Sequence, residues 1–552
     1  MKTMKKTFVI LLAAIITFGT LAGCAAPAAS SSAPHSPSYP SESANAGQAY
    51  QAPAESAAVS EDDSLMFDGM TEPYPYENVA DPTNEEYGSF AESAFNSPLK
   101  NPLSTFSIDV DTASYSQIRQ HLNDGWLPPA EAVRVEECIN YFSYDYPAPH
   151  GSDPVNVGVT ISGCPWNTSH YLARVSLKAT ELDMSEAPKS NLVFLLDVSG
   201  SMDDPDKLPL VKSAMSMLAE NLTANDRVSI VVYAGASGVV LDSCPGNDKG
   251  TINHALGWLS AGGSTAGGEG IELAYAMAAK NFIEGGNNRV ILCTDGDFNV
   301  GPSSDEELES LIENKRDSGI FLSVLGFGTG NTKDNHMETL ADKGNGNYAY
   351  IDSLMEAKKV LVNEASSTLF TVAKDVKVQV EFNPEAVREY RLVGYDNRVL
   401  AAEDFNNDKK DAGEMGAGHC VTAFYELVLV DAAEAWNSVD PLVFQDSAKP
   451  ETKKPASDWL YVKFRYKAPE SSESKLLTTM AGISNVTENP DSDYVFASAV
   501  AEFALVLKNS EYKSHATLAD AIERAKASRG TDEDGYRAQF IQLAELANTL
   551  YR

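Results

Sequence analysis

Three oxygen-bearing side chains follow an apolar run near the middle of the chain. The residues from Leu192 to Leu196 are all apolar, and Asp197, Ser199 and Ser201 come directly after them. Such a run predicts a strand buried on both faces of a parallel sheet, and these sheets bind ligands at the carboxyl ends of their strands. One carboxylate and two hydroxyls at spacing two suit a small hard cation such as Mg²⁺. The same residue types also serve as simple caps where a strand turns into a helix.

Two later stretches extend this set of oxygen ligands. A glycine-rich loop carries Thr265, and a second apolar run ends at Asp295. The order Asp-x-Ser-x-Ser, then Thr, then Asp resembles the metal-ion-dependent adhesion site (MIDAS) of von Willebrand factor type A (VWA) domains. The resemblance implies that Ser199, Ser201 and Thr265 bind the ion through their hydroxyls. It also implies that Asp197 and Asp295 act directly or through water, with Mg²⁺ as the ion and Mn²⁺ or Ca²⁺ as alternatives.

The elements around these residues indicate an α/β fold. Strand and helix patterns alternate from about 186 to 370, which predicts a doubly wound, Rossmann-like VWA domain. Residues 151–185 read as a β-hairpin, and residues 371–470 contain further strands with alternating apolar side chains. We expect the hairpin and these strands to form one antiparallel β-sandwich, with the VWA domain inserted in or flanked by it. Helical spacing returns in residues 471–552, which predicts a C-terminal helical region.

Residues 100–150 predict a smaller N-terminal helical region. A short strand leads into a helix for which Asp111 is a suitable N-cap, and a second helix is expected from Glu131 to Tyr144. The segment from about 103 to 147 resembles the N-terminal region of exported bacterial VWA lipoproteins of the YfbK-like type. In that family, a central VWA domain and a C-terminal region would cover the rest of the chain.

The start of the chain predicts export and lipid attachment. Lys2, Lys5 and Lys6 precede an apolar segment from Phe8 to Leu21, which is the pattern of a signal peptide and is too short for a confident membrane span. The Leu-Ala-Gly sequence before Cys24 resembles a bacterial lipobox, so residues 1–24 are predicted to be a lipoprotein signal with Cys24 as the acylated residue. An ordinary secretory peptide with a stray cysteine is the alternative. We therefore expect an extracytoplasmic protein, lipid-anchored to a membrane of the cell envelope.

Residues 25–99 predict a solvated tether. They are rich in Ala, Ser and Pro and contain twelve acidic residues without any Lys or Arg. Such a composition buries too little apolar surface to fold. A flexible chain of this length has a root-mean-square span of roughly 50 Å, enough to hold a domain clear of a membrane surface.

The net charge and the motifs of the chain limit the classes of function that we expect. The formal net charge of −36 excludes nucleic acid as a favoured partner, because phosphate contacts need clustered cations. The pattern favours a non-enzymatic binding module in which a protein partner presents an Asp or Glu that completes the ion's coordination. A metal-dependent hydrolase would need a general base beside the ion, and His254 is the nearest histidine to the three ligand loops. An envelope scaffold whose site is not used is the third alternative.

Overall fold

The apolar run ahead of Asp197 forms a central strand in the computed structural model. The structure describes residues 87–551 except 109, 183–186, 264–266, 297–304, 329–332, 409, 411, 432–455 and 470, all within a compact unit that starts at Val79. Strand β4 (Ser190–Asp197) is buried along its whole length and pairs in parallel with β5 (Arg227–Tyr233) and β7 (Asn287–Thr294). The sheet order is β6-β5-β4-β7-β8-β9. Its remaining strands are β8 (Ile320–Phe327), β9 (Tyr348–Ile351) and β6 (Ser237–Pro245), and β6 runs antiparallel to β5.

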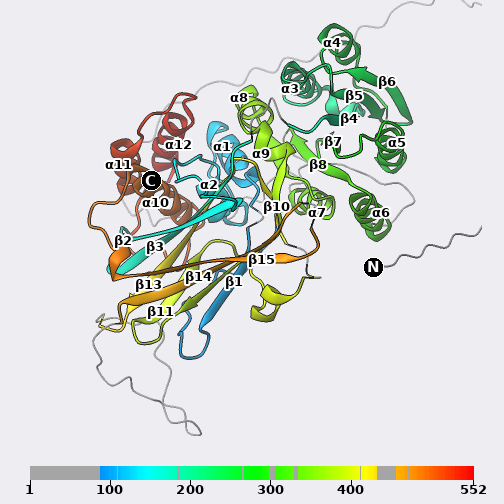
Figure 1. The fold of residues 1–552 in the computed structure, drawn as a ribbon. Helices are drawn as coiled ribbons and strands as arrows, with labels where there is room; N and C mark the ends of the chain where they lie inside the picture. Colours follow the sequence, from blue (N-terminus) through cyan, green and yellow to red (C-terminus); the bar gives the residue numbers. More distant parts are fainter. Residues whose placement is uncertain are drawn as a thin grey trace, which may run out of the picture. The chain divides into compact units, whose positions relative to one another are not determined.

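Helices cover both faces of this sheet (Figure 1). Side chains of β4 alternate between the two faces, because successive residues of a strand point in opposite directions. Leu192, Phe194 and Leu196 share a core with α3 (Leu208–Glu220), α4 (Lys249–Gly257), α8 (Leu354–Lys358), the π-helical turn η3 (Lys359–Asn363) and α9 (Ala365–Leu369). Val193 and Leu195 share the other core with α5 (Gly267–Lys280), α6 (Asp305–Asp317) and α7 (Asp334–Lys343). The doubly wound α/β prediction is confirmed.

Two antiparallel sheets form a sandwich around another core. One sheet has the order β11-β13-β3-β2, made of β2 (Val155–Cys164), β3 (Asn167–Ala179), β11 (Val387–Val393) and β13 (Cys420–Leu429). The other has the order β1-β10-β14-β15, made of β1 (Leu103–Ser107), β10 (Thr371–Phe382), β14 (Asp458–Lys467) and β15 (Ser474–Gly482), with β12 (Met415–Gly416) beside β10. Apolar side chains of both sheets share one core. The chain leaves this sandwich at β3 and returns at β10, so the α/β domain is an insertion.

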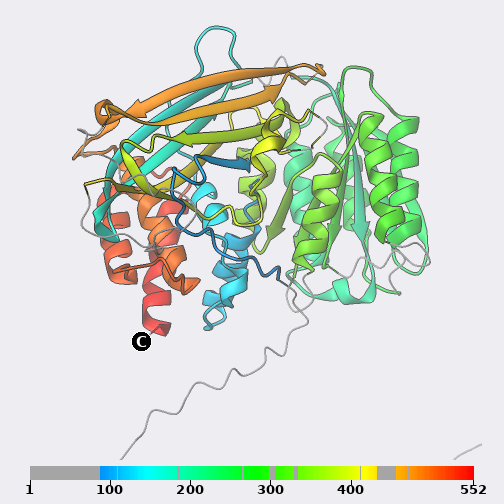
Figure 2. The same cartoon turned by 90° about the horizontal axis from the view of Figure 1, so that it is seen from below.

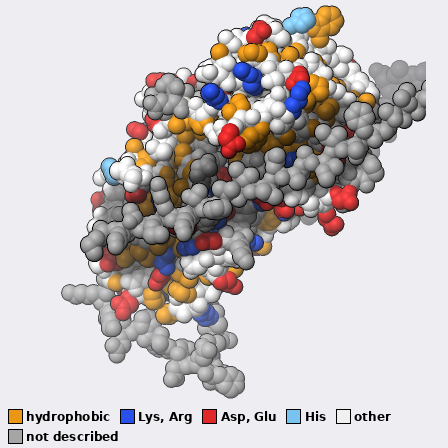
Figure 3. Space-filling model, turned by 45° about the vertical axis from the view of Figure 1, so that its right-hand side comes forward, with side chains coloured by type: hydrophobic (Ala, Val, Ile, Leu, Met, Phe, Trp, Pro, Cys, Tyr) orange, Lys and Arg blue, Asp and Glu red, His pale blue; other side chains and the backbone are white. Residues whose placement is uncertain are grey.

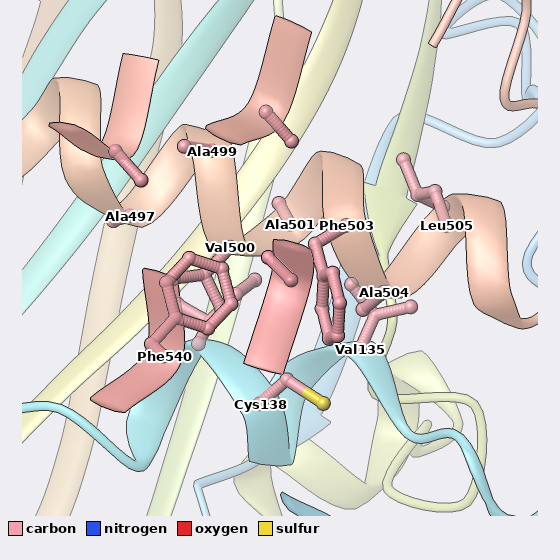
Figure 4. Close-up of a cluster of buried hydrophobic side chains, with 14 of the residues drawn as sticks. Val135, Cys138, Ala497, Ala499, Val500, Ala501, Phe503, Ala504, Leu505 and Phe540 are labelled. Atoms are coloured by element: carbon pink, nitrogen blue, oxygen red, sulfur yellow. The ribbon is translucent and has the colours of Figure 1, made fainter. Parts of the chain in front are cut away.

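A helical layer lies against the sandwich (Figure 2). It contains α1 (Ala113–Asn123), α2 (Val135–Asn140), α10 (Ser492–Leu507), α11 (Leu518–Ser528) and α12 (Tyr536–Leu550). Their apolar faces form one core, in which the rings of Phe503 and Phe540 meet edge to face at 5.1 Å between centroids (Figure 4). Short 3₁₀ turns occur at η1 (Ala130–Ala132), η2 (Gly200–Asp203), η4 (Ala402–Asn406) and η5 (Ile483–Asn485). No helix in the described ranges is long and apolar enough to cross a bilayer.

The tether predicted over residues 25–99 is wrong for residues 87–99. Phe95 is buried there, and the backbone N–H of Asn96 donates to Tyr390 O at 2.8 Å, so this segment packs on the folded unit.

Two local predictions for the N-terminal region are wrong. The helix expected from Glu131 to Tyr144 is interrupted at Arg134, which is extended (φ −106°, ψ 114°) and donates its backbone N–H to Ser114 Oγ at 2.9 Å. Asp111 is not the N-cap of α1, because the helix begins after Thr112 without a side-chain cap. The Asp111 carboxylate instead accepts a hydrogen bond from the backbone N–H of Tyr348 at 3.0 Å. Tertiary contacts therefore determine both positions.

Candidate metal centre

The two aspartates of the predicted site lie at neighbouring strand ends. β4 and β7 are paired in parallel with Leu196 opposite Cys293, so Asp197 at the end of β4 and Asp295 just after β7 come to the same edge of the sheet. The two residues are 0% and 2% exposed. A pair of buried carboxylates at the carboxyl edge of a parallel sheet is costly unless cationic charge compensates it.

The loop after β4 brings two hydroxyls to the same edge. Asp197 Oδ1 accepts a hydrogen bond from the backbone N–H of Ser199 at 2.8 Å, which folds the loop back over the strand end. The hydroxyl oxygens of Ser199 and Ser201 lie 3.0 Å apart. Ser199 is buried and Ser201 is exposed, so the hydroxyl pair reaches from the sheet edge to the surface.

The glycine-rich loop is docked beside this turn. The backbone N–H of Gly200 donates to Gly263 O at 3.0 Å, and the backbone N–H of Gly262 donates to Val198 O at 2.8 Å. Gly263 has a φ of +89°, a conformation that favours glycine. Thr265, two residues further on, lies outside the described residues, as do Asp297 and Cys24. The structure therefore brings together Asp197, Ser199, Ser201 and Asp295.

The charges of the site are poorly compensated by its hydrogen bonds. Burial raises the pKa of Asp197 from 3.8 to about 6, Ser199 and the nearby Tyr233 hydroxyl oppose this rise, and the nearby Asp295 raises the pKa further. Asp197 Oδ2 and Asp295 Oδ1 are buried and accept no hydrogen bond within the described part of the chain. Two carboxylate oxygens of this kind beside a hydroxyl pair fit a hard divalent cation. When bound there, such an ion would supply an electrophilic centre for an incoming oxygen ligand.

Histidine and cysteine take no part in this arrangement. Among the described residues, no group of three or more His, Cys, Asp and Glu side chains is placed to hold a metal. In the described part of the arrangement, Asp197 and Asp295 are the only two such residues, because the other described candidate ligands, Ser199 and Ser201, are hydroxyls. Its donor set is therefore one of oxygens alone, which suits Mg²⁺ or Mn²⁺ better than a soft metal.

One residue of the site was missed by the sequence analysis. Lys207, at the start of α3, places its Nζ 3.0 Å from Asp295 Oδ2, and the two side chains are 8% and 1% exposed. Its methylene stem passes over Gly328, where a Cβ atom would overlap it. Lys207 follows an acidic stretch that includes Asp203 and Asp204, and this position favours a solvated charge. Nothing in the sequence pattern predicts that the ammonium turns inward.

A second cluster of buried charges joins the α/β domain to the N-terminal helices. Arg119 of α1 donates to Asp352 and to Glu356 of α8, at 2.6 Å and 2.7 Å. Tyr141 donates its hydroxyl to the same Glu356 oxygen at 2.7 Å. Arg134 forms a comparable set of ion pairs, at 2.8–2.9 Å, with Glu137, Asp334 and Glu338. These pairs hold the last helical segment and α7 of the inserted domain against the N-terminal region.

The family model of the VWA domain covers the same part of the chain as the inserted α/β domain. Residues 191–364 match the von Willebrand factor type A domain, residues 81–174 match a model described as von Willebrand factor, and residues 367–550 match the C-terminal model of uncharacterized protein YfbK. The α/β domain and its neighbours thus define a VWA-domain protein. VWA domains generally mediate interactions between proteins, often through a MIDAS.

Similar proteins identify the family to which the chain belongs. The chain is 42% identical over 478 residues to uncharacterized protein YfbK of Escherichia coli (strain K12). The match covers 85% of this chain and 82% of that protein. The chain therefore belongs to the YfbK family. It is also 25% identical over 280 residues to inter-alpha-trypsin inhibitor heavy chain H3 of Homo sapiens, covering 45% of this chain and 30% of that one. Among solved structures, the chain is similar to von Willebrand factor type A from Catenulispora acidiphila, with a TM-score of 0.38 and 15% sequence identity. This match covers 68% of this chain and 87% of that one.

Proposed function

We propose that the chain is a membrane-tethered extracytoplasmic binding protein whose VWA domain recognises a protein partner through a metal-dependent adhesion site. The observation that carries this proposal is the pair of buried carboxylate oxygens on Asp197 and Asp295 that accept no hydrogen bond, beside the hydroxyls of Ser199 and Ser201. We assign Thr265 to the same site on the resemblance of the sequence to the MIDAS pattern. Mg²⁺ is the proposed ion, and Mn²⁺ is a working substitute.

The partner's contribution is an Asp or Glu side chain. Mg²⁺ prefers six oxygens in octahedral geometry, and the proposed set leaves a position that a carboxylate can fill. The contact is coordinate and short, so an acidic protein can still provide it. On the face shown in Figure 3, Lys and Arg side chains of the described surface form separate groups with acidic side chains between them. Such a distribution of charge suits binding to a protein better than binding to the phosphate backbone of a nucleic acid.

Hydrolysis is the second candidate that the ion itself would allow. It would need a general base beside the ion, and His254 was the nearest candidate along the chain. The Nε2 atom of His254 instead accepts a hydrogen bond from the indole N–H of Trp258 at 2.9 Å, on α4 and its C-cap. This contact favours binding over catalysis.

The tether and anchor are proposed from the sequence alone. The signal pattern, Cys24 and residues 25–86 of the predicted tether 25–99 lie outside the described residues. They favour attachment to the envelope membrane through a lipid on Cys24, with the folded unit on the extracytoplasmic side.

The proposal is tested by calorimetric titration of the purified full-length protein with Mn²⁺. We expect one Mn²⁺ per chain in the wild type and no measurable binding in Ser199→Ala, since the hydroxyl is lost at a strand end outside the apolar core. Ser213→Ala is the matched control, because this serine is half-buried on α3 and its hydroxyl donates to Pro209 O of the same helix. Equal Mn²⁺ affinity in wild type and Ser199→Ala would overturn the assignment.

A further inference from the structure

The ammonium of Lys207 is the one cation that the described residues place against the candidate ligands. It contacts Asp295 Oδ2 and leaves Asp295 Oδ1 without a hydrogen bond. Asp197 Oδ2 is likewise left without one. Lys207 therefore neutralises the charge of Asp295 but leaves Asp295 Oδ1 and Asp197 Oδ2 available to an ion.

The position of this ammonium is fixed by its surroundings. The backbone of Lys207 is held by its N–H, which donates to Asp204 O at 3.0 Å, and by its carbonyl, which accepts from the Val211 N–H at 2.9 Å. Its stem lies over Gly328, whose φ of +75° and missing Cβ leave the required space. Gly328 is held in turn by Tyr350, whose hydroxyl donates to the Gly328 carbonyl. The side chain of Lys207 is thus held in place beside Asp295.

The charge of the occupied centre depends on this lysine. The two carboxylates and the ammonium together carry one negative charge, so a bound divalent ion leaves one positive charge in excess. Without the ammonium, the same ion would be neutralised completely. Electrostatic interactions in a buried site are only weakly screened, so a change of one unit is felt by both the ion and its next ligand.

We propose that Lys207 is a specificity-determining residue of the metal centre, which weakens metal binding and in return keeps the occupied centre positive enough to capture an anionic ligand. This inference rests on the proposed function and adds the residue that makes the bound ion receptive to a carboxylate. It predicts that loss of the ammonium changes the two affinities in opposite directions.

The test measures both affinities on the full-length protein. In Lys207→Met we expect Mn²⁺ to bind about tenfold more tightly by calorimetry, since a repelling charge close to the ion is gone. Acetate is then titrated into the Mn²⁺-loaded protein, and displacement of metal-bound water is followed as a fall in water-proton relaxation. The half-effect acetate concentration should rise by about fivefold or more in the variant. Chloride at equal ionic strength corrects for screening.

Two further variants keep the result interpretable. Lys207→Gln removes the charge but retains a hydrogen-bond donor for Asp295, so it should show the same opposite shifts if Lys207→Met folds poorly. Lys508→Met is the matched control, because Lys508 pairs with Asp396 at 2.9 Å in a partly buried ion pair elsewhere, between the end of α10 and the loop after β11. It should change neither affinity.

The outcomes separate this inference from the proposed function. If Ser199→Ala binds Mn²⁺ as the wild type does, the metal centre itself is misassigned. If Ser199→Ala loses Mn²⁺ while both Lys207 variants leave the two affinities unchanged, only the role of Lys207 is refuted. Tighter Mn²⁺ binding with equal or stronger acetate binding would make Lys207 a simple competitor of the metal, which also contradicts the proposal.

Discussion

Arg119 and Glu356 form an ion pair of 2.7 Å between the N-terminal helical region and the inserted domain, with side chains that are 1% and 0% exposed. The pair is embedded in a larger set of contacts, because the same guanidinium also binds Asp352. One guanidinium thus bridges two carboxylates at the start of the last helical segment of the domain.

Replacing Arg119 with Met should lower the stability of the protein markedly. Breaking a buried ion pair from one side costs about 3–5 kcal/mol, because the remaining charges stay buried without a partner. The free energy of unfolding, measured by denaturant titration, should fall by that amount. Arg316→Met is the control, since its pair with the largely exposed Asp317 should contribute about 1 kcal/mol or less. A similar loss in both variants would contradict a special role for Arg119.

Metal binding should depend on pH through Asp197. The pKa of this carboxyl is about 6, so protons compete with the ion below that value. The apparent Mn²⁺ affinity should rise about tenfold per pH unit below pH 6 and level off above it. Titrations between pH 5 and 8 on wild type and Lys508→Met should give the same profile. An affinity that does not change from pH 5 to 6.5 would argue against Asp197 as a ligand.

The same pKa shift has a consequence for the metal-free fold. The native state holds the Asp197 proton more tightly than the unfolded chain, in which the pKa is near 3.8. The contribution of this group to stability is therefore most favourable below about pH 4 and declines as the pH rises to about 6. Added Mn²⁺ should restore stability above pH 6, which thermal unfolding in the presence and absence of chelator can measure.

The sandwich should not form without the strands that precede the insertion. β3 pairs with β13 and β1 pairs with β10, so residues 371–552 alone lack the neighbours of two strands. We expect this fragment to be insoluble or molten, whereas residues 187–370 should fold by themselves. Co-expression of residues 87–182 should recover soluble 371–552. A well-dispersed NMR spectrum from 371–552 alone would disprove the arrangement.

Thr265 should matter to partner binding more than to the fold. Partner capture from envelope extracts in Mg²⁺ should be lost on adding chelator and weakened sharply in Thr265→Ala. Raised salt should have only a modest effect, because the decisive contact is coordinate rather than long-range. A partner whose affinity survives both chelator and Thr265→Ala would place recognition outside the metal centre.

Cys24→Ala tests the anchor. The variant should be released from membranes or accumulate unprocessed, because lasting attachment depends on acyl chains that each contribute about 0.8 kcal/mol per buried methylene. Detergent phase partitioning and mass spectrometry of the N-terminus report the two outcomes. A variant of mature size that still partitions wholly into detergent would exclude lipidation at this residue.

Much of the fold could be predicted because its signals are local. The apolar run of β4 and the alternating strands of the sandwich follow directly from the spacing of hydrophobic residues. The metal centre could be predicted in part because Asp197 and Asp295 end such runs. Lys207 could not be predicted, since its inward direction depends on space over Gly328, more than 100 residues away. The break at Arg134 was missed for a similar reason, because its partners Asp334 and Glu338 belong to another domain.

The insertion of the VWA domain also sets a path for mechanical force. The candidate site lies at the carboxyl edge of the sheet, whereas the chain enters β4 from β3 at the opposite edge. A pull on a bound partner would therefore run along the axis of β4. This strand is hydrogen-bonded on both sides, to β5 and to β7, so its bonds would share the load in shear rather than open one at a time. The strand that presents Asp197 is thus held on both sides against such tension.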